Sequence, residues 1–498
     1  FSEIRGKNPK HRMSTSQPQQ LVAAGNVLAY PATNGGTPMF LETGYASTAF
    51  LLIMSALVFL MTPGLGLFYS GLSRSKNAVT LIMVCFLSMS IVTVQWVLFG
   101  FSLAFSESGS AFIGNFDYAG LTHFGASALS LTAPAVPRII FATYQMKFAS
   151  ITPALIFGSV SERFRILPSM LFLPIWVTIV YCPVAYWTWS ARGWLRNLSC
   201  LQSTVITSTP CGIGSYDFAG GGPVHITSGF AGLAYIIILG KGKVPASAQA
   251  PLAHDMSNVF LGTGLLWFGW FAFNGGSALA ATPRAAMAAI VTTVSAASAS
   301  MTWVAIEYVR RKKVSGIGFC SGVIAGLVCI TPGSGFVAPW ASIVFGIIGG
   351  LSCYASVHIK NYCGMDDTLD TFSVHGVGGI LGSILTGIFA EKWVAMLDGT
   401  VISGGAINGN WIQLAFQLCG STAIAIYSFG VSFAILYTIN KIPRFHLRPN
   451  EADEFAGADI TQMAEILYVT VPVGSSSFRP GSQEKSELPV LENVRIPI

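Results

Sequence analysis

The chain has 498 residues, of which 52% are hydrophobic and only 10% are charged. A soluble domain usually carries about 25% charged residues, so this composition excludes an ordinary soluble protein and indicates a membrane protein. The net charge of +6 does not indicate nucleic-acid binding, because the basic residues lie in short clusters between apolar runs.

The chain begins with an N-terminal segment, residues 1–45, that we expect to lie outside the membrane. A more natural start, "MSTSQPQQ", begins at Met13, so residues 1–12 are interpreted as upstream sequence or a cloning remnant. No basic region leads directly into an apolar core with a small-residue cleavage site, and a cleaved signal peptide is therefore not expected.

Residues 46–440 alternate between apolar runs of membrane length and short polar loops, and residues 441–498 form a polar tail. About 20 apolar residues cross a bilayer as a helix, so we expect an all-α polytopic membrane protein with eleven transmembrane helices. The expected spans are 48–72, 79–105, 137–160, 167–190, 222–241, 257–278, 286–309, 316–333, 337–358, 373–391 and 411–440.

Basic residues gather in alternate loops, and this pattern predicts the orientation. The richer loops carry Arg74, Lys76, Arg163, Arg165, Lys241, Lys243, Arg310, Arg311, Lys312, Lys313, Lys360, Lys441, Arg444 and Arg448. The opposite loops carry few basic residues, namely Arg192, Arg196, Arg284 and Lys392. The positive-inside rule therefore places the N-terminus outside the cell and the 441–498 tail in the cytoplasm.

The loop after the fourth span supports this orientation. Its Asn197-Leu198-Ser199 sequon predicts N-glycosylation of Asn197, and the loop lies on the outer side.

Cys200 and Cys211 share the same loop, where a disulfide between them is one option. The nine cysteines of the chain show no zinc-ligand spacing, so neither a metal site nor another cofactor is expected.

Two histidines lie inside apolar segments, His225 in "GGGPVHITSGF" and His375 in "DTFSVHGVGGI". Each follows an aspartate, Asp217 or Asp370, in a glycine-rich stretch. An ionisable group at bilayer depth is costly, so such residues usually face a cavity or one another and mark a transport or proton path. The alternative is a pair of histidines that only pack in the core.

The two histidine segments are the fifth and the tenth expected spans. Because five spans reverse the side on which the next one starts, the two halves should form an inverted five-helix repeat, followed by one extra helix. A substrate path is then expected at the interface between the halves. No nucleophile–base set appears in the sequence, so we predict a transporter or channel for a small polar or cationic solute, and no enzyme.

Aromatic residues near the outer span ends favour a cation. Trp189 ends the fourth span, Phe148 lies in the third, and Trp270, Phe273 and Ser277 lie in the sixth. Ring faces bind a partly desolvated cation with ~1–2 kcal/mol, and a serine oxygen adds a hydrogen-bond acceptor. The alternative interpretation of Trp189 is an interfacial aromatic belt.

Four motifs resemble those of the ammonium transporter (Amt/Mep/Rh) family, in order and spacing. They are "PGLGLFYSGLSRSKN" at 63–77, "DFAGGGPVHI" at 217–226, "FGWFAFNGGSA" at 268–278 and "DTFSVHGVGGILG" at 370–382. The chain is most similar to the fungal ammonium permeases with a twin-histidine pore. The resemblance implies eleven helices and a plasma-membrane homotrimer with one pore per subunit. Its implied substrates are ammonium, ammonia and methylammonium.

The resemblance also implies which side chains serve the pore. The implied substrate-binding residues are Trp189, Phe148, Ser277, Trp270 and Gln145. The implied gate is Phe148 with Phe273, and the implied proton relay is His225 with His375. Asp217, together with Asp370, is the implied structural and electrostatic support. A bare ion pays a large Born cost in an apolar pore, so we expect ammonium to lose a proton and ammonia to cross.

Histidine at position 225 resembles the subgroup associated with ammonium sensing as well as uptake. Two alternative functions remain: an Rh-type gas channel, which usually lacks outer residues like Trp189 and Ser277, and an ammonium receptor with little flux.

In the tail, Gly457 and Asp459 fit the family's regulatory stretch, whereas "TQMAE" at 461–465 departs from it.

Overall fold

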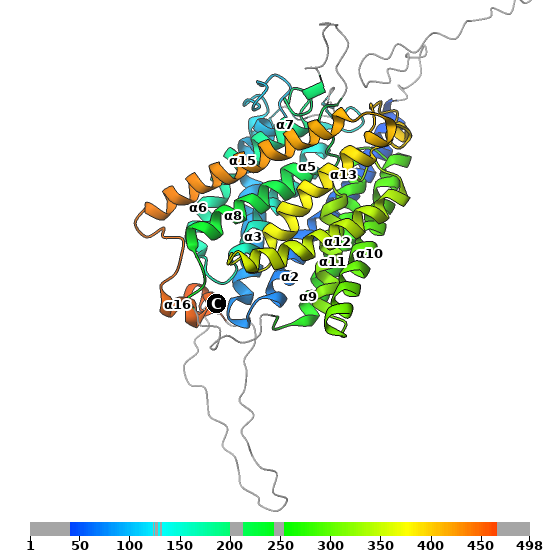
Figure 1. Ribbon diagram of the computed structural model, residues 1–498. Coiled ribbons are helices and arrows are strands. Elements are labelled where there is room, and N and C mark those ends of the chain that lie inside the picture. The colour runs from blue at the N-terminus through cyan, green and yellow to red at the C-terminus, as the bar shows by residue number, and fades with distance from the viewer. Residues whose placement is uncertain are drawn as a thin grey trace, which may run out of the picture.

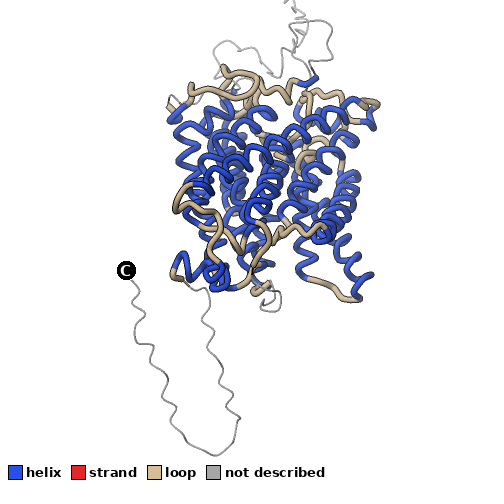
Figure 2. Tube along the Cα trace, turned by 60° about the vertical axis from the view of Figure 1, so that its left-hand side comes forward, coloured by secondary structure: helices blue, strands red, loops and turns tan. Residues whose placement is uncertain are grey.

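The computed structural model describes residues 40–122, 124, 128–129, 132–199, 213–243 and 253–465. In these residues the regular structure is helical, and the β-type pairing is limited to one isolated bridge between Leu129 and Ala133. Figures 1 and 2 show tilted helices side by side, with connecting loops at two opposite ends of the bundle. The proposed Cys200–Cys211 pairing lies outside the described residues.

Ten helical segments in this part of the chain are long and apolar enough to cross a membrane. They are Gly44–Leu72, Ser75–Phe105, Arg138–Val160, Ile166–Trp189, Gly221–Leu239, Met256–Ala278, Pro283–Arg311, Pro339–Lys360, Phe372–Phe389 and Ile412–Lys441. Each coincides with an expected span to within a few residues. The remaining expected span, 316–333, is a shorter apolar helix, Gly316–Ile330, so the count of eleven stays a prediction.

Several spans join an α-helix to a short π or 3-10 segment. The first half contains α1 (Phe40–Phe59), α2 (Met61–Leu72), η1 (Ser75–Asn77), α3 (Ala78–Gln95), η2 (Trp96–Gly100), α4 (Phe101–Phe105), η3 (Ala119–Leu121), α5 (Arg138–Ile156), η4 (Phe157–Val160), α6 (Ile166–Trp176), η5 (Val177–Tyr181), α7 (Cys182–Trp189), η7 (Gly221–Ile226) and α8 (Thr227–Leu239).

The second half contains α9 (Met256–Gly275), η9 (Gly276–Ala278), α10 (Pro283–Arg311), α11 (Gly316–Ile330), α12 (Pro339–Tyr362), η10 (Phe372–Val377), α13 (Gly378–Phe389), α14 (Lys392–Ala395), η11 (Met396–Asp398), η12 (Ala406–Asn408) and α15 (Ile412–Lys441). The tail adds α16 (Glu451–Ala456) and η13 (Asp459–Met463). Helices satisfy their own backbone hydrogen bonds, which is what a chain needs in order to cross a bilayer several times.

Large apolar side chains face outward along these helices, as in Leu52, Val94, Phe260, Leu351 and Ile426. Such an outward face would be unstable in water but matches the hydrocarbon of a membrane. Polar side chains inside the bundle mostly bond to the backbone of their own helix, as Thr263 does to Val259 O at 2.7 Å. The bundle is therefore a membrane-embedded domain with an apolar outside.

The two histidine-bearing segments approach each other through glycines. A Cβ atom added to Gly229, in α8, would collide with the backbone of Gly376, in η10. A Cβ atom on Gly379 would lie 2.9 Å from the carbonyl oxygen of Gly221. Small residues let two helix backbones approach closely in membrane proteins. These glycines thus set the short distance between the two halves.

The tail docks on one end of the bundle, which we call the tail face: residues 73–77, 161–165, 240–243, 363–370 and 442–465. In Figure 1 the α16 segment lies there, at the lower left of the bundle. The Asp459 carboxylate accepts hydrogen bonds from Val79 N (3.0 Å) and Thr80 N (2.8 Å), in the first turn of α3. A carboxylate at this position satisfies free amides and complements the helix dipole.

Gln462, in the "TQMAE" stretch that departs from the family, also takes part in docking. Its Oε1 accepts from Ile166 N at 2.8 Å, and its Nε2 donates to Phe164 O at 3.1 Å. The divergent stretch therefore still binds the bundle of its own chain.

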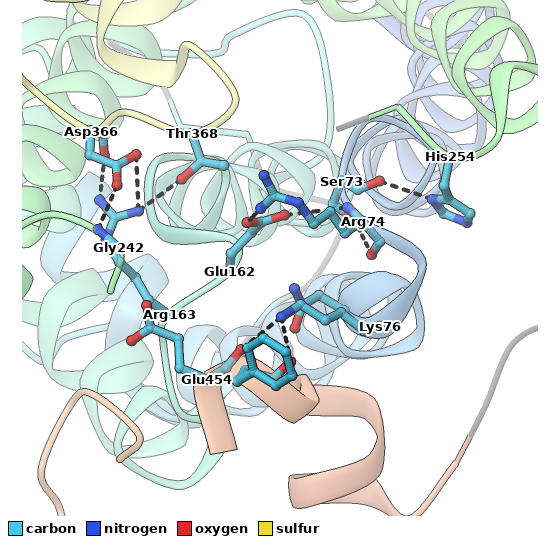
Figure 3. Close-up of polar contacts among 12 residues, drawn as sticks. Ser73, Arg74, Lys76, Glu162, Arg163, Gly242, His254, Asp366, Thr368 and Glu454 are labelled. Atoms are coloured by element: carbon cyan, nitrogen blue, oxygen red, sulfur yellow. Dashed lines mark hydrogen bonds and ion pairs between the residues drawn. The ribbon is translucent and has the colours of Figure 1, made fainter. Parts of the chain in front are cut away.

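Ion pairs hold the loops of the tail face together, namely Arg74 with Glu162 and Arg163 with Asp366 (Figure 3). Arg163 is 2% exposed, and it donates to Gly240 O at 3.0 Å and to Thr368 Oγ1 at 2.9 Å. It also forms an ion pair with Asp366 at 3.4 Å. A buried cation is costly unless it is paired and hydrogen-bonded, and Arg163 meets both conditions. It ties the end of α8 to the loop that leads into η10.

The glycine contact between the halves generates a test. We expect Gly229→Ala to lower the yield of folded protein and its thermal midpoint in detergent, because overpacking costs roughly 1–3 kcal/mol where the backbone cannot move. Gly264→Ala is the matched control, since a Cβ atom there meets nothing within 4 Å. Equal thermal midpoints for the two variants would contradict the close approach.

Candidate functional site

Each of the two histidines lies in a π-helical turn, His225 in η7 and His375 in η10. A π turn inserts an extra residue into a helix, and such insertions are frequent at functional sites. Both side chains are buried, with exposed fractions of 1% and 4%. Each histidine therefore lies near the start of a helix, in the interior of the bundle.

The two rings bond to each other. His225 Nδ1 and His375 Nδ1 lie 3.1 Å apart, and the ring centroids are separated by 5.2 Å. One Nδ1 must carry the hydrogen and the other must supply the lone pair. If both rings are neutral, they are opposite tautomers: one has Nδ1–H and the other Nε2–H. Nε2 of His225 has no hydrogen-bond partner within the described residues.

An aspartate caps each histidine-bearing turn. The Asp217 carboxylate accepts hydrogen bonds from the amides of residues 220–222 at 2.7, 2.8 and 2.6 Å. Oδ2 of Asp367 accepts from Phe372 N (2.9 Å) and Ser373 N (3.4 Å). The first amides of a helix have no partner inside that helix, so these carboxylates supply one. The two caps keep the histidine-bearing turns in place.

Burial raises the pKa of the Asp217 carboxyl to about 6, while the three amide hydrogen bonds act in the opposite direction. The carboxyl lies at the end of the bundle opposite the tail face, where its ionised form would attract a cation.

The aspartate that caps the second turn, Asp367, was not among the residues that the sequence analysis named, which gave Asp370 as structural and electrostatic support. Asp370 forms an ion pair with Lys360 and has a positive φ of 60°. The first histidine-bearing turn has the same geometry: Gly220 has a positive φ of 116°. Gly220 lies three residues after Asp217, and Asp370 lies three residues after Asp367. Asp217 and Asp367 each precede their histidine by eight residues. That equal spacing was the signal that could have identified Asp367.

The predicted aromatic residues come together beyond the histidines. Phe148, from α5, stacks on Phe273, from α9, with ring centroids 4.0 Å apart and an interplanar angle of 24°. Trp189, at the end of α7, meets Phe148 edge-on at 6.0 Å. Its Nε1 donates to the carbonyl oxygen of Asp217 at 3.1 Å. Phe148 and Phe273 are each 1% exposed, whereas Trp189 is partly exposed.

Ser277 and a missed residue, Tyr144, complete this aromatic cluster: Trp189, Phe148, Phe273, Ser277 and Tyr144. The Tyr144 hydroxyl donates to Phe273 O at 2.7 Å and lies 3.4 Å from Ser277 Oγ. Its ring centroid is 5.0 Å from that of Phe148. Only the fold reveals this role, because Tyr144 stands in no motif that the sequence analysis used.

Two other predicted residues have different surroundings. Trp270 stacks on His225 at 5.4 Å and donates from Nε1 to Thr331 Oγ1 at 2.9 Å. It therefore lies beside the histidine pair rather than at the outer edge of the aromatic cluster. Gln145 is buried, and its Oε1 has no hydrogen-bond partner among the residues that the structure describes.

Asn197, the predicted glycosylation site, stabilises its own loop. Its Nδ2 donates to Ala191 O and to Gly193 O, both at 2.8 Å. A glycan replaces one hydrogen of this amide, so it would compete with these bonds. Glycosylation of Asn197 stays a prediction.

A cavity of about 210 Å³ begins at Phe273 and runs toward the tail face. Its wall is mostly apolar, and it includes both histidines and Trp270. At its other end it is lined by Thr368, Leu369 and Asp370, which belong to the tail face. Trp189, Phe148 and Ser277 are not part of the wall. The stacked phenylalanines of the aromatic cluster thus lie between Trp189 and Ser277 on one side and the cavity on the other.

This arrangement suits a small cation that can lose a proton. Ring faces and polar oxygens attract a cation at the cluster, while the apolar cavity disfavours any charge. The histidine pair can accept and donate protons inside that cavity. No group of three or more His, Cys, Asp or Glu side chains in the described ranges could hold a metal ion.

Comparison with known proteins identifies the family to which the chain is similar. Residues 49–468 match the Ammonium Transporter Family. Ammonium transporter 1 of Schizosaccharomyces pombe is 43% identical over 445 residues, 87% of this chain and 85% of the relative. Ammonium transporter MEP2 of Saccharomyces cerevisiae is 42% identical over 432 residues, 85% and 83% of the two chains. The crystal structure of Candida albicans Mep2 matches with a TM-score of 0.75 and 41% identity, covering 83% of this chain and 88% of that chain.

The capping role of Asp367 generates a prediction. Asp367→Ala leaves the first amides of η10 without an acceptor, which costs roughly 1–3 kcal/mol for a buried donor. We expect a lower thermal midpoint in detergent than for the unchanged chain. Glu465→Gln, which removes an exposed carboxylate from the same face, serves as the control. An unchanged midpoint for Asp367→Ala would rule out the cap.

Proposed function

The chain belongs to the ammonium transporter family, and we propose that it binds ammonium at the aromatic cluster, removes one proton and passes ammonia through the histidine-lined cavity. One observation carries this proposal: the Phe148–Phe273 stack stands between a cation-attracting cluster and an apolar cavity that contains a proton-accepting pair. We further propose that the chain is a plasma-membrane protein whose substrates include methylammonium.

The binding step uses the aromatic cluster. The faces of Trp189 and Phe148 attract a cation with ~1–2 kcal/mol when it is partly desolvated. Ser277 Oγ offers a hydrogen-bond acceptor to N–H groups, and we propose the buried Gln145 Oε1, which has no partner among the described residues, as a second acceptor. The ionised form of Asp217 adds a field that favours positive charge. Trp189 and Ser277 are partly exposed, so the ion can reach the cluster from solution.

The proton must leave before the substrate enters the cavity. Moving a charge from water into an apolar cavity costs far more than two ring faces return. Neutral ammonia costs much less. Ring centroids 4.0 Å apart are in van der Waals contact, so Phe148 and Phe273 must move apart for each molecule that passes. This gate excludes a hydrated ion by size and a bare ion by charge.

The histidine pair can relay the released proton without holding a net charge for long. Ammonium divides into ammonia and a proton, and the proton binds Nε2 of the ring that carries Nδ1–H. That ring passes its Nδ1 hydrogen to Nδ1 of the other ring across the 3.1 Å bond. The second ring then releases its own Nε2 hydrogen toward the tail face. Each passage exchanges the tautomers, which must reset before the next one.

Selectivity follows from the same chemistry. Potassium has nearly the size of ammonium but carries no proton to give up, so it cannot become neutral. It would have to cross the apolar cavity as an ion and pay the full desolvation cost. The proton-transfer step therefore discriminates between two cations that the aromatic cluster binds similarly.

We propose the wider arrangement on the same grounds. The two halves form an inverted repeat, supported by matching π turns, matching caps and matching positive φ angles at positions 220 and 370. The N-terminus lies outside the cell, and the tail face lies in the cytoplasm. The assembly is a homotrimer with one pore per subunit, and a sensing role accompanies uptake.

Two alternatives are less well supported. An Rh-type gas channel needs no cation site, yet Trp189 and Ser277 belong to one cluster with Phe148. An ammonium receptor with little flux needs no cavity beyond the gate, yet the cavity continues from Phe273 to Asp370 at the tail face. Both features favour transport.

Trp189→Leu tests the binding step. In cells that lack their own permeases, we expect the full chain to support saturable methylammonium uptake. The variant should raise the KM of that uptake about tenfold, because it loses a cation–π face. Trp411→Leu removes a tryptophan that is 70% exposed and tests the belt interpretation. If both variants behave like the unchanged chain, Trp189 is a belt residue. If the unchanged chain gives no uptake, the receptor alternative is favoured.

Replacing the histidines tests the relay. We expect His225→Ala, His375→Ala and the double variant to reach the cell surface, with ammonium-driven current falling sharply or with potassium leaking through. Each replacement removes a proton acceptor and the Nδ1–Nδ1 bond while leaving an apolar wall. His446→Ala, an exposed histidine outside the spans, is the control. Normal current and normal selectivity in a well-expressed double variant would end the relay proposal. Low surface abundance instead would indicate a packing role.

A further inference from the structure

A buried arginine lies at the end of the bundle opposite the tail face, and the transport steps above do not use it. Arg284 is 4% exposed and belongs to the first turn of α10. A cation at a helix N-terminus opposes the helix dipole, so this position requires compensation. Arg284 Nη1 lies 3.1 Å from an Asp398 carboxylate oxygen and donates to Thr400 Oγ1 at 2.9 Å. Its Nε donates to Gly335 O at 2.7 Å.

Two aromatic rings enclose the same guanidinium. Its carbon lies 4.9 Å from the ring centroid of Phe218 and 4.8 Å from that of Phe336. The two rings meet at 5.8 Å and 80°. One side chain therefore contacts three parts of the chain that are far apart in the sequence: Phe218, residues 335–336 and residues 398–400. We call this set of contacts the arginine clasp.

The clasp fixes Phe218 from several sides. Phe218 N donates to Pro332 O at 2.9 Å. Gly335 lies so close to the Phe218 ring that a Cβ atom there would collide with it. The guanidinium covers another part of the ring. Phe218 consequently has little freedom to move, and neither has the peptide that joins it to Asp217.

That peptide bears directly on the aromatic cluster. The Asp217 carbonyl oxygen belongs to it and accepts the hydrogen bond from Trp189 Nε1. The Asp217 carboxylate caps the turn that carries His225. A shift of Phe218 would thus move the carbonyl oxygen that orients the Trp189 indole, whereas three amide hydrogen bonds keep the Asp217 carboxylate at the start of η7.

We propose that Arg284 is a positioning residue for cation recognition, which acts through Phe218 and Asp217 to hold the Trp189 ring against Phe148. This inference rests on the proposed function of the aromatic cluster. Arginine suits the role because its planar guanidinium stacks on two rings while its N–H groups bond in the same plane. Lysine retains the charge but lacks the plane, and glutamine lacks both the charge and the length.

The test compares Arg284→Lys and Arg284→Gln in the full chain by methylammonium uptake and surface abundance. We expect the KM to rise about tenfold for Arg284→Gln and less for Arg284→Lys, because small displacements of a binding group are costly. The maximal rate per surface molecule should stay within about twofold, since the gate and the histidines are unchanged. Arg310→Gln is the matched control: it removes an arginine from the other end of α10 that also lies over a ring, that of Tyr354 at 5.7 Å.

A double variant separates positioning from a general structural role. If Arg284 acts through Trp189, then Arg284→Gln combined with Trp189→Leu should have nearly the KM of Trp189→Leu alone. Additive effects of the two replacements on the KM would overturn the proposal. An unchanged KM in Arg284→Gln, whatever its surface abundance, would also overturn it. If Trp189→Leu itself has no effect, the proposed binding site fails and the clasp proposal fails with it. If Trp189→Leu raises the KM and Arg284→Gln does not, the clasp proposal alone fails.

Discussion

A hydrogen bond between two imidazole rings in an apolar interior is the constraint on which the rest of the structure depends. The Nδ1 atoms of His225 and His375 can meet at 3.1 Å only if two chain segments start their helices inside the bundle. A helix start exposes amides without partners, which is costly where water is absent. Asp217 and Asp367 provide the acceptors. Glycines at positions 229 and 376 provide the short distance between the backbones. Cap, glycine contact and histidine pair therefore depend on one another.

The two ends of this centre use the same backbone geometry for different purposes. At one end, Asp217 connects to Trp189 and, through Phe218, to the arginine clasp, so the cap belongs to an aromatic cluster that attracts a cation. At the other end, Lys360 pairs with Asp370, and Arg163 pairs with Asp366, so the cap belongs to a charged loop. In the proposed function, the substrate arrives as an ion and leaves an apolar cavity into water. It therefore needs a cation-attracting cluster at one end and a charged, hydrated loop at the other.

The stacked phenylalanines divide the path into two regions that differ in how well they stabilise a charge. The proposed cation-binding residues Trp189 and Ser277 lie on one side of the Phe148–Phe273 contact, and the histidine-lined cavity lies on the other. A charge is therefore stabilised up to the stack and penalised beyond it. In the proposed function, this difference in charge stabilisation, rather than a narrow pore by itself, makes loss of a proton the favourable way across.

The amino-acid sequence by itself determined the membrane class, ten of the spans, the two buried histidines and the family, because these depend on local hydropathy and contiguous motifs. It could not place side chains whose neighbours come from distant segments. Only the tertiary structure decided that Asp367 caps the second histidine-bearing turn, that Trp270 stacks on His225, and that Tyr144 joins the cluster. It also showed α11 to be shorter than the other spans. The physical reason is that hydropathy adds up along the chain, whereas a hydrogen bond or a ring contact depends on where two separate helices cross.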